Sequence, residues 1–181
     1  SRRRHTRFRN VTGVQTCALP ISLAPSLEIE SPPLAELVRD INKFSNNVMA
    51  QQLLLTLSLQ QRGSGSFAAS REIVQRWWKE RITDTEAPAM ANGSGLSRDE
   101  RISAQGLARL LQWSWGSAVM PELIASLPLS GVDGTLRRSR MRSGAAHLKT
   151  GSLRDVVGVA GYVLGASGQR HVVVVMVNHP N

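Results

Sequence analysis

The chain contains a single cysteine among its 181 residues, Cys17, which excludes an internal disulfide and a cysteine-rich metal site. Its longest unbroken apolar run, from Val172 to Val177, is far shorter than the ~20 residues that cross a bilayer as a helix. Hydrophobic residues nevertheless make up 41% of the chain. That fraction is enough to bury the core of one ordinary domain, and it excludes disorder for most of the sequence.

Acidic residues are few, because 13 Asp and Glu stand against 22 Lys and Arg, for a formal charge of +9. Such an imbalance is typical of proteins that bind nucleic acid. Five of the basic residues, however, are arginines within the first nine positions, where there is no acid. From Ser22 onward the charge is 17 minus 13, or +4, and no alternation of aromatic and basic residues remains. The sequence therefore does not favour a nucleic acid partner.

The first 21 residues differ in character from the rest. Residues 11–21 follow neither a helical nor a strand period and contain no apolar stretch long enough for a signal peptide. A common sequencing-adapter oligonucleotide, translated in frame, gives residues 11–21, and an outer part of the same adapter gives residues 1–7. We interpret residues 1–21 as a non-native, disordered segment and residues 22–181 as the native domain. The alternative is a genuine basic N-terminal arm.

Hydrophobic periodicity predicts helices first and strands last in residues 22–181. Helical spacing occurs at about residues 34–41, 45–59, 68–82, after 103 and at 121–127. Strands are expected at about residues 145–150, 156–164 and 171–177, with a hairpin turn at 166–169. This order predicts an α+β fold that ends in a three-stranded antiparallel meander, rather than a parallel α/β sheet.

Four details of this prediction can be compared with a structure. Ser31 and Ser103 are expected to be helix N-caps. The helix at 45–59 is apolar nearly all round, so we expect it to be buried. The tryptophan pair Trp77 and Trp78 is expected to pack toward a core. The valine-rich last strand is expected to be central and buried on both faces.

Two short motifs could carry chemistry. Ser45-Asn46-Asn47 stands at the start of a predicted helix, and Lys149-Thr150-Gly151-Ser152 ends a predicted strand. A hydroxyl and an amide at a helix tip would face a lysine at a strand edge, a set of groups that can pass protons and hold a carboxylate. Gly151 would let a substrate backbone approach the strand, and the Ser152 N–H could stabilise an oxyanion.

Each motif also has a plainer interpretation when taken alone. Ser45 could simply cap a helix, Lys149 could be a solvated charge, and Gly151 could mark a bulge. No histidine and carboxylate have the spacing of metal ligands, so the sequence predicts neither a metal site nor a cofactor. The two motifs matter because of their order and separation.

That order and separation resemble the serine penicillin-recognising enzymes, which pair Ser-x-Asn with Lys-Thr-Gly. Residues 92–98, 127–138 and 147–153 are further similar to segments of the D-alanyl-D-alanine carboxypeptidase/endopeptidase family, and the resemblance covers residues 31–180. It implies part of a serine β-lactamase/D,D-peptidase-like fold. Asn92 and Asn46 depart from the aspartates that are usual in the family at these positions.

The resemblance also implies roles for the site residues. Ser45 would pass protons to the leaving amine, Asn47 would bind the substrate amide, and Lys149 would supply positive charge and order the Ser45 hydroxyl. Thr150, Gly151 and Ser152 would bind the substrate, with Thr150 and Ser152 at its terminal carboxylate. Substrates would be peptidoglycan peptides ending in D-Ala-D-Ala and their cross-links, located in the periplasm or elsewhere outside the cytoplasm, and β-lactams would acylate the enzyme.

The family's nucleophile motif, Ser-x-x-Lys, has no counterpart in this sequence. None of the three lysines, Lys43, Lys79 and Lys149, has a serine three residues earlier. We expect the nucleophile, its lysine and the first strands of the catalytic sheet to precede Ser22, and the fragment to be inactive alone. Two alternatives are a penicillin-recognising domain that only binds and, less favoured, a basic nucleic-acid-binding protein.

Overall fold

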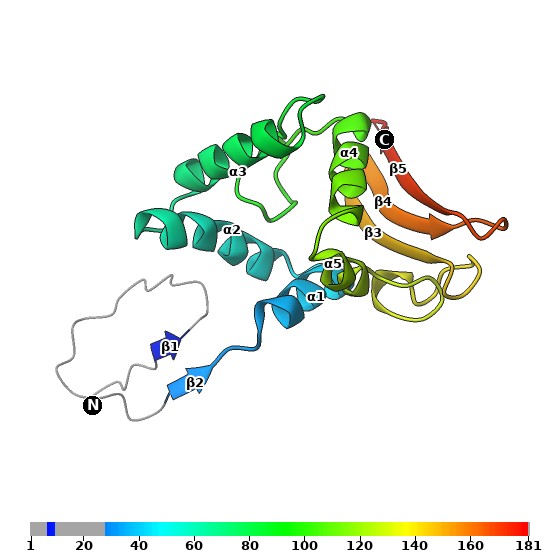
Figure 1. Cartoon of the computed structure of the whole chain (residues 1–181), viewed down its shortest axis with the longest axis horizontal. Coiled ribbons are helices and arrows are strands. Elements are labelled where there is room, and N and C mark those ends of the chain that lie inside the picture. The colour runs from blue at the N-terminus through cyan, green and yellow to red at the C-terminus, as the bar shows by residue number, and fades with distance from the viewer. Residues whose placement is uncertain (1–6, 10–27, 181) are drawn as a thin grey trace.

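A computed structural model describes residues 7–9 and 28–180 of the chain. From residue 34 onward, helices come first and a three-stranded antiparallel sheet comes last, as the sequence predicts (Figure 1). The elements are β1 (Arg7–Arg9), β2 (Glu28–Glu30), α1 (Leu34–Phe44), α2 (Asn47–Arg62), α3 (Phe67–Arg81), α4 (Ala104–Trp115), α5 (Met120–Ser126), the 3-10 helix η1 (Gly134–Leu136), β3 (Ala146–Leu153), β4 (Val156–Leu164) and β5 (Arg170–Asn178).

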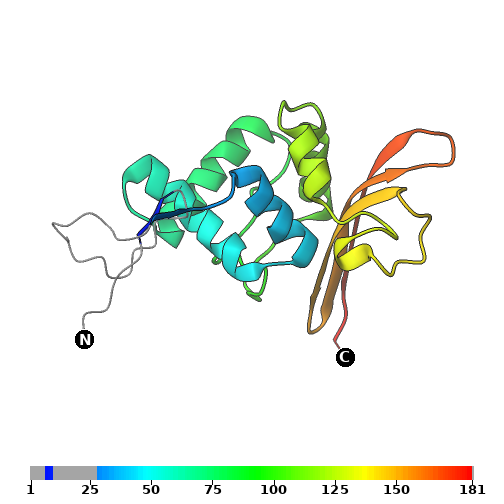
Figure 2. The same cartoon turned by 90° about the horizontal axis from the view of Figure 1, so that it is seen from below.

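The strands β1 and β2 form a separate parallel pair in which Phe8 lies opposite Ile29. Figure 2 shows this pair at the opposite end of the molecule from the sheet of β3, β4 and β5. Arg7–Arg9 thus form a strand within the segment that the sequence predicts to be disordered. Residues 1–6 and 10–21 lie outside the described residues, and the non-native origin of this segment stays a prediction.

The helix caps match the sequence at one expected position and differ at another. Ser103 caps α4, because its hydroxyl accepts a hydrogen bond from the N–H of Gly106 at 2.9 Å. Ser31, in contrast, is not the cap of α1: that position belongs to Pro33, whose carbonyl accepts the N–H groups of Glu36 and Leu37. The helix therefore starts after the proline pair instead of before it.

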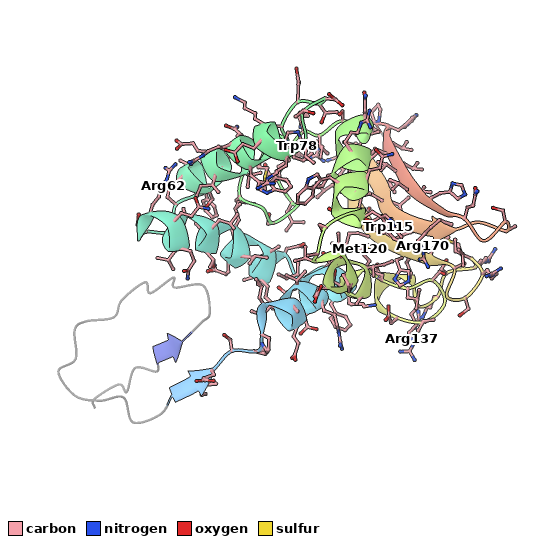
Figure 3. All side chains as sticks on the ribbon, in the orientation of Figure 1. Arg62, Trp78, Trp115, Met120, Arg137 and Arg170 are labelled. Atoms are coloured by element: carbon pink, nitrogen blue, oxygen red, sulfur yellow. The ribbon has the colours of Figure 1, made fainter. Side chains whose placement is uncertain are left out.

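Helix α2 is less buried than its apolar sequence predicts. Only Leu54 and Ser58 are buried along it, and Val48 is 68% exposed. The helix packs on α3 and on α1, and its remaining residues are half-buried or exposed. Of the tryptophan pair, Trp78 packs inward as predicted: it is buried and donates to Thr85 O at 3.1 Å (Figure 3). Trp77 is half-buried, with its ring edge-to-face against that of Trp113 at 5.0 Å.

The core lies between α4, α5 and one face of the sheet. Leu111, Leu127 and Tyr162 are buried together, and the Tyr162 hydroxyl donates to Leu111 O at 2.7 Å. Val172 and Val174 of β5 pack against this group.

In this structure β5 is neither central nor buried on both faces, and the strands that we expect to lie beside it are among those expected to precede Ser22. The strand order is β3-β4-β5, so β5 lies at an edge. Val175 and Val177 point away from α4, by the alternation of side chains along a strand, and are 49% and 54% exposed. A valine-rich run predicts a strand because of its β-propensity, whereas the burial of that strand depends on which other elements cover each of its two faces.

The loop between α5 and β3 fixes the outer edge of β3 near its start. Ser130 N donates to Ala146 O at 2.9 Å, and Leu148 N donates to Pro128 O at 2.9 Å. These bonds cover the first half of the strand edge. The second half, from Thr150 onward, remains available at the site described next.

Candidate active site

Ser45 forms the junction between α1 and α2. It ends α1 in the left-handed backbone region (φ 53°, ψ 49°), and Asn46 then caps α2 by accepting from Met49 N at 3.0 Å. The sequence placed Ser45 at the start of the second helix, whereas Ser45 ends the first. Left-handed residues other than glycine are uncommon and concentrate at functional sites.

Lys149 meets this junction from the sheet, although it lies 104 residues away in sequence. Its Nζ donates to Ser45 Oγ at 2.6 Å and to Thr150 O at 2.6 Å. The predicted proximity of Ser45 to Lys149 is therefore confirmed as geometry, whereas the roles of these residues stay predictions. The side chain is half-buried, and this desolvation lowers the pKa of Lys149, because removal from water disfavours the ammonium form.

The direction of this bond determines what the serine can do. Because Ser45 Oγ accepts from Lys149, the hydroxyl hydrogen of Ser45 points elsewhere and can be donated to a third group. A serine held between a cation and a bound molecule can receive a proton from one side and pass one to the other.

Asn47 connects the junction to residues 92–98, the segment that the sequence analysis singled out. With the amide turned so that both hydrogen bonds are satisfied, Asn47 Nδ2 donates to Ser94 O at 3.0 Å and to Ser45 O at 3.2 Å. Asn92 Oδ1 accepts from Ser94 N at 3.0 Å, so this asparagine makes the side-chain turn that the usual aspartate can also make.

Thr150, Gly151 and Ser152 form the exposed end of β3. The Thr150 hydroxyl donates to Thr135 Oγ1 at 3.0 Å, and a Cβ on Gly151 would meet no atom within 4 Å. N–H groups alternate between the two edges of an antiparallel strand, and that of Leu148 points outward to Pro128. The N–H of Ser152 therefore points to the same outer edge, beyond the stretch that the loop covers.

Three residues near the site were not identified from the sequence. Lys43 and Asp133 form an ion pair at 2.6 Å, and Thr135 contacts Thr150 as described above. Burial alone would raise the pKa of Asp133, but the hydrogen bonds from Lys43 and the Leu129 N–H lower it overall. The sequence signal was slight: a lysine two residues before Ser45 and an acid inside the segment 127–138.

His147, two residues before Lys149 on β3, does not reach Ser45. Its Nδ1 lies 3.1 Å from Ile124 O, and burial lowers the pKa of His147. The site is also distinct from a cavity of about 480 Å³ where Arg170 lies over the ring of Trp115 (Figure 3). The described residues contain no cluster of side chains suited to a metal ion, and none of the described helices could cross a membrane.

Comparison with known proteins places this geometry in a family. A model of the D-Ala-D-Ala carboxypeptidase 3 (S13) family matches residues 9–181. The D-alanyl-D-alanine carboxypeptidase of Actinomadura sp. (strain R39) is 32% identical over 148 residues, which are 77% of this chain and 27% of that protein. The D-alanyl-D-alanine carboxypeptidase DacB of Haemophilus influenzae is 26% identical over 160 residues, 82% of this chain and 32% of that protein.

A solved structure shares the fold. Penicillin binding protein 4 (dacB) from Haemophilus influenzae superposes with a TM-score of 0.76 at 25% identity, over 83% of this chain and 35% of that one. The predicted α+β, partial D,D-peptidase-like fold is therefore confirmed. The chain spans about a third of the length of the relatives it matches. On the family match, the chain belongs to the D-Ala-D-Ala carboxypeptidase 3 (S13) family.

Proposed function

We propose that this chain is part of a serine-type D-Ala-D-Ala carboxypeptidase or endopeptidase that acts on peptidoglycan stem peptides and their cross-links through an acyl-enzyme. The observation that carries the proposal is the 2.6 Å bond from Lys149 Nζ to Ser45 Oγ, in a chain of this family. The enzyme would act outside the cytoplasm, where its substrate lies, and β-lactams would acylate it. A related structure is complexed with a β-lactam, which supports this last point.

In the proposed reaction, a serine of a Ser-x-x-Lys motif outside this chain attacks the carbonyl carbon of the penultimate D-alanine. The C–N bond breaks, and the leaving amine needs a proton. The lysine of that motif, as a neutral amine, takes the proton of the attacking hydroxyl and passes it to Ser45. Ser45 donates its own hydroxyl hydrogen to the leaving amine and so ends as a hydroxyl again, which is possible because Lys149 holds the Ser45 oxygen and leaves its hydrogen free. Water then attacks the acyl ester, the peptide leaves with a free carboxylate, and the nucleophile regains its hydrogen. Lys149 stays protonated and stabilises the negative charge that develops nearby.

The open end of β3 would hold the substrate as an added strand. The Ser152 N–H would donate to the oxyanion, and the Thr150 hydroxyl would donate to the terminal carboxylate. Thr150 now donates to Thr135, but hydroxyl groups rotate, so the pair can reverse and release the Thr150 hydrogen. Asn47 Oδ1 would accept the N–H of a substrate amide.

A second candidate function is a penicillin-recognising domain that binds without catalysis. The absence of Ser-x-x-Lys from these 181 residues is compatible with this function and with the first one. The two functions differ in one respect: a binding domain holds a peptide ending in D-Ala-D-Ala but never releases D-alanine from it.

The test measures D-alanine release from an N-acylated peptide ending in D-Ala-D-Ala. The chain alone should release none, whereas the protein extended upstream to include a Ser-x-x-Lys motif should release it. In the extended protein, Ser45→Ala should lower the rate by about 100-fold or more, the range of a lost acid–base group. Ser64→Ala, an exposed serine in the loop after α2, is the matched control and should keep the full rate. Full activity of Ser45→Ala would contradict the proposal.

A further inference from the structure

The two halves of the candidate site are joined at a second place, through the loop before β3. Lys43 lies two residues before Ser45 on α1, and only 8% of it is exposed. Its Nζ donates to Asp133 Oδ2 at 2.6 Å and to Leu127 O at 2.8 Å. The end of α1 is thus tied to this loop by bonds that involve neither Ser45 nor Lys149.

Asp133 is also hydrogen-bonded within its own loop. Its Oδ1 accepts from Leu129 N at 2.8 Å, so the carboxylate is anchored in the loop while Oδ2 reaches Lys43. The next residue, Gly134, lies directly against α1: a Cβ there would come within 2.7 Å of Lys43 O. The loop therefore packs on the backbone of α1 as well as on its lysine.

The same loop then reaches β3. Thr135 Oγ1 accepts from Thr150 Oγ1 at 3.0 Å, and Thr150 follows Lys149 on the strand. Lys149 donates to Ser45, which returns the connection to the end of α1. These contacts close a ring through α1, the loop and β3, in which the Lys43–Asp133 pair and the Ser45–Lys149 bond are two of the links.

We propose that Lys43 and Asp133 are positioning residues, whose ion pair holds Ser45 Oγ within hydrogen-bond distance of Lys149 Nζ. If Asp133 is lost, the buried ammonium of Lys43 is left without its counterion. If Lys43 is lost, the half-buried carboxylate of Asp133 no longer ties the loop to α1. One of the contacts that hold the end of α1 close to β3 is then missing, and the Ser45–Lys149 hydrogen bond forms less often. The inference rests on the proposed function only for the chemical meaning of that bond.

The small number of lysines makes the test direct, because the chain has only Lys43, Lys79 and Lys149. Competitive acetylation with acetic anhydride across the alkaline range, analysed by peptide mass spectrometry, yields for each lysine its pKa and its reactivity when deprotonated. Lys79, exposed on α3, is the internal reference. We expect Asp133→Asn to raise the intrinsic reactivity of Lys149 relative to Lys79 by about fivefold or more, the lower end for energetically coupled sites.

Lys43→Met supplies a second variant, in which a flexible apolar side chain of similar length occupies the buried position. It should raise the Lys149 reactivity as Asp133→Asn does, and the double variant should exceed neither single variant, because all three break the same link. In each of them the pKa of Lys149 should rise, since the amine is less desolvated once it leaves Ser45.

Two controls separate positioning from general loss of stability. Glu72→Gln removes the acid from the exposed Arg62–Glu72 pair, and Ile73→Val weakens the core under α3. Neither should change the Lys149 to Lys79 ratio, although Ile73→Val should lower the unfolding midpoint. A ratio that follows the unfolding midpoint in all variants, or that stays unchanged in Asp133→Asn and Lys43→Met, would overturn the proposal. No substrate is used, so the result is independent of D-alanine release, which tests the proposed function separately.

Discussion

Replacing Gly134 by alanine tests directly whether the loop before β3 is seated on the end of α1. Gly134 has a φ of 55°, and a Cβ there would lie 2.7 Å from Lys43 O and 3.2 Å from two carbons of Pro128. Gly144 in the same loop is the matched control: its φ is 74°, and a Cβ there would meet nothing within 4 Å. Both substitutions place an alanine in the left-handed region, but only one also forces an atom against a backbone carbonyl.

The expected magnitudes follow from these two costs. An alanine in the left-handed region costs roughly 1–2 kcal/mol at either position. Overpacking against fixed backbone adds roughly 1–3 kcal/mol at Gly134 alone. The smaller backbone entropy of alanine in the unfolded chain is the same for both variants and cancels in their difference. Gly134→Ala should therefore be less stable than Gly144→Ala by about 1–3 kcal/mol.

Urea unfolding followed by circular dichroism measures this difference, provided that the slope with denaturant stays the same in both variants. Equal losses of stability, within about 0.5 kcal/mol, would refute the contact between Gly134 and Lys43. A larger loss in Gly144→Ala would do the same, because it would place the crowded position elsewhere in the loop.

Three further predictions concern stability and solubility. The pKa of Asp133 lies below its usual range, so its stabilising effect is complete above the ordinary aspartate pKa of about 4 and is lost as the pH falls through the lower folded value. The urea midpoint should therefore fall less steeply with decreasing pH in Asp133→Asn than in the unchanged protein. Equal slopes of urea midpoint against pH in the acid range would contradict this. Burial raises the pKa of Tyr162, the only tyrosine, so its phenolate absorbance should appear above about pH 10 in the folded protein and return to the ordinary value in urea. Val177→Lys on the exposed face of β5 should lower aggregation measured by light scattering, whereas Val174→Lys, which faces the core, should lower the unfolding midpoint instead.

Local sequence signals were sufficient for α1 to α5 and for β3, β4 and β5, but not for the short elements β1, β2 and η1. The strand expected at residues 156–164 is β4, Val156–Leu164, and the helix expected at 68–82 is α3, Phe67–Arg81. Periodicity and capping involve only a few neighbouring residues, so they can be recognised in the sequence without knowledge of the fold. Burial was predicted less well, because the exposure of Val48 or Val175 depends on which distant elements cover that face.

The candidate site also contains residues that the sequence could predict and residues that it could not. Ser45 and Lys149 were found because two motifs of fixed composition stand in a fixed order, and the structure brings their side chains together. The Lys43–Asp133 pair has no such pattern, since two opposite charges 90 residues apart are indistinguishable in sequence from solvated ones. Only the packing of the loop against α1 shows that they meet.

Intact-protein mass spectrometry after incubation with penicillin tests the central claim, that Ser45 and Lys149 belong to the site of an acyl-enzyme peptidase. The 181-residue chain should gain no mass, because the nucleophile motif is not in its sequence. The protein extended upstream to include Ser-x-x-Lys should gain one penicilloyl group on that serine. In the extended protein, Lys149→Met should slow acylation by about 100-fold or more, as the loss of one electrostatic donor does in other enzymes. A covalent adduct on the chain alone, or full-rate acylation of Lys149→Met, would contradict the account.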